Sequence, residues 1–67
     1  CTISPGVTIC GDVTIGDRVL IGAGATICDR VAIGNDVTIG AGTIILPETI
    51  IQDGETWVGN PGRRIER

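Results

Sequence analysis

Residues 7–40 read VTICGDVTIGDRVLIGAGATICDRVAIGNDVTIG, a run of six-residue units that share one pattern. A small or β-branched residue stands two positions before each isoleucine from Ile9 onward, whereas Glu55, two positions before Trp57, breaks that series. An internal repeat of this kind is typical of a solenoid. Isoleucine returns at every sixth position, and Trp57 takes the tenth place, after Ile3, Ile9, Ile15, Ile21, Ile27, Ile33, Ile39, Ile45 and Ile51.

Each six-residue unit predicts one short β-strand followed by one corner. Side chains alternate along a strand, so Val7 and Ile9 point to one side while Thr8 and Cys10 point to the other. The Gly, Asp and Asn residues that follow tolerate the unusual backbone angles of a tight corner. A strand this short cannot bury its apolar side alone, so the corners must bring successive strands around a shared interior. The repeat therefore predicts an all-β solenoid.

The composition of the 67 residues fits one small domain and narrows the classes of partner. The net charge is −3, and the acidic body argues against a surface that binds nucleic acid. Three of the five basic residues, Arg63, Arg64 and Arg67, lie at the carboxyl end, where we expect a solvated tail; a phosphate site is the alternative. No apolar run is long enough to span a membrane, and no secretion signal is present. Three Cys at irregular spacing predict reduced thiols and a cytoplasmic location.

The chain lacks the residues of common catalytic sites. It contains no His, which removes the usual general base and excludes a histidine-ligated metal site. Its aspartates stand at the corners of the repeat, where turn geometry and solvation account for them. We therefore predict neither a catalytic residue nor a metal site. These corner aspartates are Asp12, Asp17, Asp29, Asp36 and Asp53.

The repeat resembles that of the bacterial hexapeptide transferases, which runs Ile/Leu/Val, Gly, two variable residues, Ser/Thr/Ala/Val and one variable residue. The similarity extends from Ile3 to about Ile65. It implies a left-handed parallel β-helix of about three triangular coils, with 18 residues per coil, over residues 1–58. Residues 59–67 are then a C-terminal cap or tail, and Trp57 is a lid on the last coil. Residues 18 apart stack, so Ile3, for example, lies under Ile21.

Two segments narrow the resemblance to the sialic-acid and bacillosamine acetyltransferases. Residues 2–13, TISPGVTICGDV, are similar to a His-Ile-Ser/Ala-Pro-Gly…Gly-x-Val segment of that group. Residues 59–63, GNPGR, are similar to the Gly-Asn-Pro-Ala-Lys/Arg sequence that follows the last coil in many acetyl-CoA-dependent members of the family. Thr2 stands where the group has a His that contacts the cofactor, and Gly62 stands where it has Ala. The catalytic His of the family lies upstream of the matched segment. We therefore expect this chain to lack acetyltransferase activity by itself.

The resemblance also implies a cofactor and partners. In the family, acetyl-CoA lies along a groove between the prisms of a homotrimer and meets residues at stacked corners, and a sugar or nucleotide-sugar is the acceptor. The positions carried over are Gly11 with Asp29, Ala23 with Ala41, and, for the CoA phosphates, Arg63 and Arg64.

Two other functions remain open on the sequence alone. One is a non-catalytic, self-associating scaffold of natural, truncated or engineered origin. Both this reading and the trimer are consistent with the apolar column that Cys10, Cys28 and Leu46 present outward. The other is an ice-binding β-helix with outward threonines, which is disfavoured because Leu20 and other apolar residues interrupt each threonine column.

Overall fold

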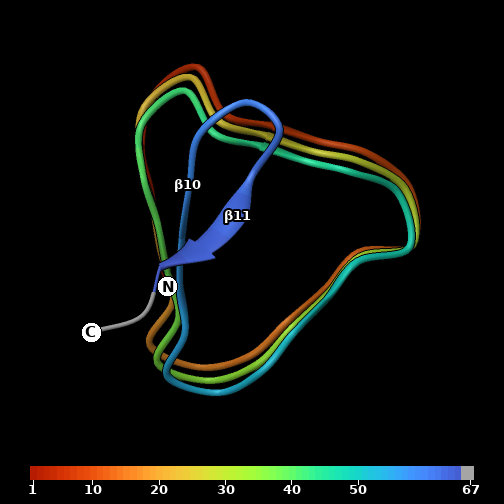
Figure 1. The fold of residues 1–67 in the computed structure, drawn as a ribbon, viewed down its shortest axis with the longest axis vertical. Helices are drawn as coiled ribbons and strands as arrows, with labels where there is room; N and C mark the ends of the chain where they lie inside the picture. Colours follow the sequence, from red (N-terminus) through yellow and green to blue (C-terminus); the bar gives the residue numbers. More distant parts are fainter. Residues whose placement is uncertain (66–67) are drawn as a thin grey trace.

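The computed structural model describes residues 1–65, which form an all-β prism wound from short strands (Figure 1). No helix long and apolar enough to cross a membrane occurs in this part of the chain. The strands are β1 (Thr2–Ile3), β2 (Thr8–Ile9), β3 (Thr14–Ile15), β4 (Leu20–Ile21), β5 (Thr26–Ile27), β6 (Ala32–Ile33), β7 (Thr38–Ile39), β8 (Ile44–Ile45), β9 (Ile50–Ile51), β10 (Thr56–Val58) and β11 (Arg63–Ile65).

Three sheets form the sides of the prism, and within them β1–β10 pair in parallel with the strand one coil away. The sheet orders are β1-β4-β7-β10-β11, β2-β5-β8 and β3-β6-β9. The pairing register joins Ile3 to Ile21 and Ile21 to Ile39, which confirms that residues 18 apart stack. The predicted β-helix of about three coils is confirmed.

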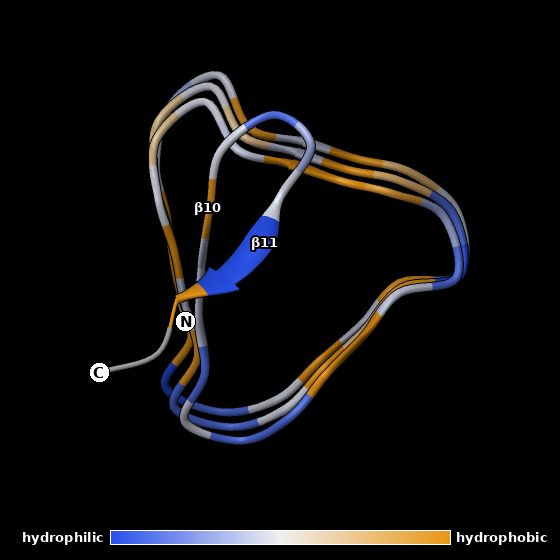
Figure 2. Cartoon of the chain, in the orientation of Figure 1, coloured by the Kyte–Doolittle hydropathy of each residue, from blue (hydrophilic) through white to orange (hydrophobic). Residues whose placement is uncertain are grey.

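The core is the set of inward residues that the repeat predicts. Ile21, Ile27 and Ile45 are fully buried, and the residues two positions before them are buried as well. Figure 2 shows apolar segments along the sides of the prism and polar segments at two of its corners. Burial fails at the amino-terminal end, where Ile3 is 48% exposed, because no coil of the described chain covers that side.

The carboxyl-terminal end is closed by β10, a turn and β11. Residues 59–62 turn the chain back, and β11 runs antiparallel to β10 across the end of the prism (Figure 1). Two backbone hydrogen bonds with Ile44 hold the turn: Ile44 N–H donates to the Gly59 carbonyl (3.1 Å), and Gly62 N–H donates to the Ile44 carbonyl (2.7 Å). Trp57 packs against the core, as expected for a lid.

The basic end of the chain differs from the solvated tail that the sequence suggests. Arg63 and Arg64 lie in β11, and Arg64 forms an ion pair with Glu55. The strand forms because β10 would otherwise leave an unpaired edge at this end of the sheet. Arg67, the third basic residue of the predicted tail, lies outside the described residues.

Candidate functional site

The prism has three columns of corners, and their chemistry differs. We call residues 5–6, 23–24 and 41–42 the first corner, residues 11–12, 29–30 and 47–48 the second, and residues 17–18, 35–36 and 53–54 the third. The later residue of each pair has a positive φ angle in every coil. At the first corner this residue is always glycine, and at the second it is always charged, as in Asp12 (φ 59°). At the third corner it is charged in two coils, as in Arg18 (φ 56°), and is Gly54 in the last.

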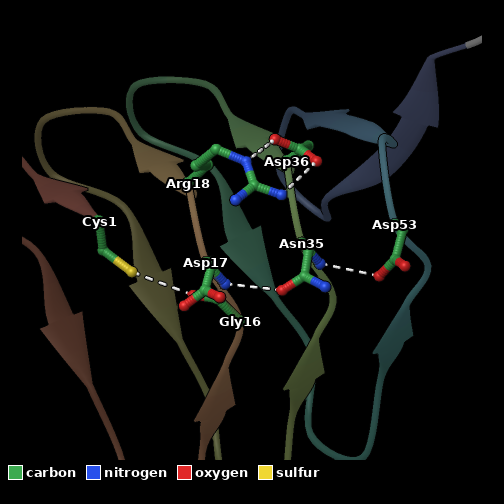
Figure 3. Close-up of polar contacts among 7 residues, drawn as sticks. All are labelled: Cys1, Gly16, Asp17, Arg18, Asn35, Asp36 and Asp53. Atoms are coloured by element: carbon green, nitrogen blue, oxygen red, sulfur yellow. Dashed lines mark hydrogen bonds and ion pairs between the residues drawn. The ribbon is translucent and has the colours of Figure 1, made fainter.

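Side chains of the third corner close it with a ladder of hydrogen bonds (Figure 3). Asp17 N–H donates to Asn35 Oδ1 (2.7 Å), and Asn35 N–H donates to Asp53 Oδ1 (2.8 Å). Beside this ladder, Arg18 Nε lies 2.6 Å from Asp36 Oδ1. The hydrogen bond with Arg18 holds the pKa of Asp36 below its usual value and raises the pKa of Arg18. The polar groups of this corner are thus engaged with one another.

The second corner is closed in the same manner over its first two coils. Gly11 N–H donates to Asp29 Oδ1 (3.1 Å), and Arg30 forms an ion pair with Glu48 (3.4 Å). The predicted stacking of Gly11 with Asp29 is therefore present. The Asp29 carboxylate, however, already accepts a backbone hydrogen bond, and its negative charge disfavours a nearby phosphate.

At the first corner, backbone N–H groups in two successive coils have no hydrogen-bond acceptor within the described residues. Ala23 and Ala41 are exposed, and within residues 1–65 neither backbone N–H has an acceptor. Three amides at the other corners, those of Gly11, Asp17 and Asn35, donate to an Asp or Asn side chain 18 residues further on. The residues 18 beyond these alanines are Ala41 itself and Gly59, which carry no side-chain acceptor. Two donors consequently stand in line along the prism axis, ~4.8 Å apart.

The turn at residues 59–62 lies beside this column and is followed by an arginine. The turn is held on Ile44, just beyond the first corner, and Arg63 pairs with Val58 as the chain returns along β10. Arg63 is exposed and makes no ion pair with another described residue. Ala23 and Ala41 therefore stand at the first corner, and Arg63 begins the strand that leaves the turn beside it.

Arg64 faces a different partner, which sequence reasoning missed. Glu55 accepts hydrogen bonds from Arg64 (3.0 Å), from the Trp57 indole (3.2 Å) and from Gln52 N–H (2.9 Å). The Arg64 hydrogen bond, aided by those from Trp57 and Gln52, holds the pKa of Glu55 below its usual value, although burial acts in the opposite direction. One feature of the sequence could have indicated a special role for Glu55: it interrupts the series of small and β-branched residues.

The predicted cofactor positions consequently fall into two groups. Gly11 and Ala23 are 12 residues apart, which is two-thirds of an 18-residue coil, so they belong to different corners. A ligand parallel to the prism axis can follow Ala23 and Ala41, or Gly11 and Asp29, but not both pairs. The open amides and Arg63 both favour the first corner.

Comparison with known proteins agrees with the predicted resemblance. Residues 1–29 match the family model "Bacterial transferase hexapeptide (six repeats)". No curated protein sequence matches the chain significantly. Among solved structures, the acetyltransferase domain of PglB from Neisseria gonorrhoeae is 40% identical, with a TM-score of 0.88 over 94% of this chain and 30% of that one. The same domain has been solved in complex with acetyl coenzyme A.

Two further structures extend the comparison. A mutant GDP-perosamine N-acetyltransferase from Caulobacter crescentus, in complex with CoA and GDP-perosamine, is 28% identical, with a TM-score of 0.94 over 100% of this chain and 31% of that one. A maltose O-acetyltransferase from Clostridium difficile is 42% identical, with a TM-score of 0.75 over 82% of this chain and 28% of that one. The chain thus spans less than a third of the length of these proteins.

The comparisons also give the hand of the helix. The similar acetyltransferases have a left-handed β-helix fold, and a chain wound in the opposite hand would not superpose on them at such TM-scores. The chain is a left-handed hexapeptide-repeat β-helix of the kind found in bacterial acetyltransferases.

Proposed function

We propose that this chain is the β-helix portion of an acetyl-CoA-dependent sugar O- or N-acetyltransferase, and that its first corner binds the cofactor. The observation that carries the proposal is the pair of open amides at Ala23 and Ala41, with the exposed Arg63 on the strand that follows the neighbouring turn. The similarity to acetyltransferase structures, some of them with CoA bound, supports it.

The residues of the first corner fit the chemistry of coenzyme A. Its pantetheine arm carries amide carbonyls that accept hydrogen bonds, and the N–H groups of Ala23 and Ala41 offer two donors one coil apart. Methyl side chains and Gly42 let an extended ligand approach the backbone closely. Arg63 would then meet the phosphates, for which a guanidinium is a suitable donor. Bound in this way, acetyl-CoA supplies the acetyl group as a thioester.

The acceptor in such a reaction is a sugar amine or hydroxyl, and its attack needs a base. The chain contains no His, and the carboxylates at the corners are engaged in hydrogen bonds or solvated. Loss of general-base help alone reduces a rate by ~10²–10⁴-fold. We therefore propose that residues 1–67 bind CoA without turnover. Acceptor-dependent release of CoA thiol by the pure chain would contradict this part of the proposal.

Self-association into a homotrimer forms the second part of the proposal. Leu46 is 51% exposed, and it continues the outward column of Cys10 and Cys28 along one side of the prism. Covering this column would remove apolar surface from water. Light scattering at micromolar concentration should give the mass of three chains. A monomeric mass would contradict the trimer while leaving the cofactor site open to its own test.

Removing a single backbone N–H gives a sharp test of the cofactor site. Proline already stands at Pro5 in the same column of the first corner, so Ala23→Pro and Ala41→Pro should keep the fold and remove only the donor. Each should weaken CoA binding in calorimetry by ~10-fold, the effect of about one net hydrogen bond. As a control, Asp29→Pro places proline at the second corner, where Pro47 follows one coil on. It also removes the acceptor of Gly11 N–H, so its stability is measured in parallel, and it should leave the affinity unchanged.

The outcomes of the binding experiment separate the candidate functions. Binding of CoA that both first-corner prolines weaken supports the acetyltransferase portion. A trimer that binds no CoA would instead support the self-associating scaffold. An ice-binding face has no support, because the threonine columns are interrupted in register: Leu20 pairs between Thr2 and Thr38, and Ile44 follows Thr26.

A further inference from the structure

Glu55 is an acidic residue at the closed end of the prism with three hydrogen-bond donors around one carboxylate. Its side chain is only 14% exposed, and it accepts from Gln52 N–H, from the Trp57 indole and from Arg64. The donors come from the corner before β10, from β10 itself and from β11. The carboxylate therefore joins the last coil to the returning strand.

The contact with Arg64 also determines the direction of its neighbour. Arg64 pairs with Trp57, and Arg63 pairs with Val58, in the antiparallel register of β10 and β11. Because successive side chains of a strand point to opposite faces, fixing Arg64 toward Glu55 directs Arg63 to the other face. The same register sets the position of the turn that bonds to Ile44 beside the first corner.

We propose that Glu55 is a positioning residue for the nucleotide end of the cofactor: it holds Arg64 and β11 so that Arg63 faces the phosphates of a ligand on the first corner. This inference rests on the proposed function and deepens it. It assigns Arg64 to the support of the site and Arg63 alone to direct phosphate contact. The class of ligand that depends on Glu55 is a phosphorylated adenosine diphosphate, the nucleotide part of CoA.

A purely structural role for Glu55 predicts a different pattern of binding. If Glu55 only stabilised the fold, its loss would weaken the binding of every first-corner ligand by the same factor. If Glu55 positions Arg63, its loss weakens the binding of CoA. The binding of pantetheine, which lacks the nucleotide, is then unchanged. Glu55→Gln is suited to this test because the amide oxygen still accepts from Gln52 and Trp57 while the charge that holds Arg64 is removed.

The experiment measures CoA and pantetheine affinities by calorimetry on the full chain. Glu55→Gln and Arg63→Gln should each lower the affinity for CoA by ~10-fold and leave the affinity for pantetheine unchanged. A loss of this size corresponds to one hydrogen bond to a charged group. The double variant should bind CoA as Arg63→Gln does, because both changes remove one interaction. Arg30→Gln, which breaks the exposed pair with Glu48 at the second corner, is the control and should change neither affinity.

Hydrogen exchange of the backbone amides gives a second readout that needs no ligand. Glu55→Gln should speed exchange in residues 59–65 and leave the amides of the first two coils unchanged. Additive losses in the double variant, or unchanged exchange in residues 59–65, would overturn the inference even if the wild-type chain binds CoA. A wild-type chain that binds no CoA would overturn the proposed function and this inference together, whatever the exchange result.

Discussion

The backbone N–H of Asn35 donates a 2.8 Å hydrogen bond to Oδ1 of Asp53, which stands 18 residues further on at the same corner. The Asn35 side chain does the same for Asp17 in the coil before (2.7 Å). The side chains of Asn35 and Asp53 thus each accept from an amide of the preceding coil. The first corner lacks this device, because alanine and glycine carry no acceptor, and its amides remain available to a ligand.

Replacing Asn35 by alanine should destabilise the chain modestly. The variant loses the acceptor for the Asp17 amide and keeps the bond from its own N–H to Asp53. One net hydrogen bond at an accessible corner corresponds to about 0.5–1.5 kcal/mol of unfolding free energy in urea denaturation. Asn35→Asp keeps the Oδ1 acceptor and serves as the control. An alanine variant as stable as the wild type would show that the ladder contributes nothing to stability.

Core substitutions should be costly in the middle coil and mild at the amino-terminal end. Ile27 is fully buried, whereas Ile3 is 48% exposed. Ile27→Ala should lower the unfolding free energy by ~2–5 kcal/mol, since it removes buried methyl groups and leaves a cavity. Ile3→Ala should cost much less. Equal losses at the two positions, measured in the same urea series, would be incompatible with the stacking of the coils.

Removing a buried hydroxyl should stabilise the chain. Thr43 is fully buried, and its Oγ1 has no hydrogen-bond partner within the described residues. Thr43→Val keeps the shape and removes the unsatisfied group, so we expect a gain of ~1 kcal/mol in thermal or urea unfolding. Thr49 occupies the same place in a later repeat, but its Oγ1 donates to the Leu46 carbonyl (2.7 Å). Thr49→Val should therefore destabilise, and a loss at Thr43 would refute the argument.

Stability should fall in acid, and Glu55 should account for part of the loss. The pKa of Glu55 in the folded chain is lowered, chiefly by the Arg64 hydrogen bond. A group with a depressed folded pKa stabilises the fold fully above its unfolded pKa, about 4.3 for Glu, and this contribution disappears as the pH falls through the folded value. Urea midpoints between pH 7 and pH 3 should therefore fall less steeply for Glu55→Gln than for the wild type. Parallel curves would exclude this linkage.

The sequence was sufficient for the fold because the repeat is local and redundant. Ile21, Ile27 and Ile33 each specify the same strand and corner, so neighbouring units reinforce one prediction. The cofactor site stays a prediction. The structure places Ala23 and Ala41 at one corner, Gly11 and Asp29 at another, and Arg63 on the strand that crosses the closed end. The 18-residue period already predicts that Gly11 and Ala23 lie at different corners, because 12 residues are two-thirds of a coil.

The order of residues alone determined the β-strands, the interior columns and the register of 18, because side-chain alternation and burial of isoleucine allow one arrangement of such a repeat. Only the tertiary structure decided where the basic end of the chain lies and how the closed end of the prism is held. Those features depend on contacts between groups that the repeat does not relate, such as Glu55 with Arg64 and Gly62 with Ile44. Such contacts form only after the coils have stacked, when the end of the prism offers β11 an unpaired edge.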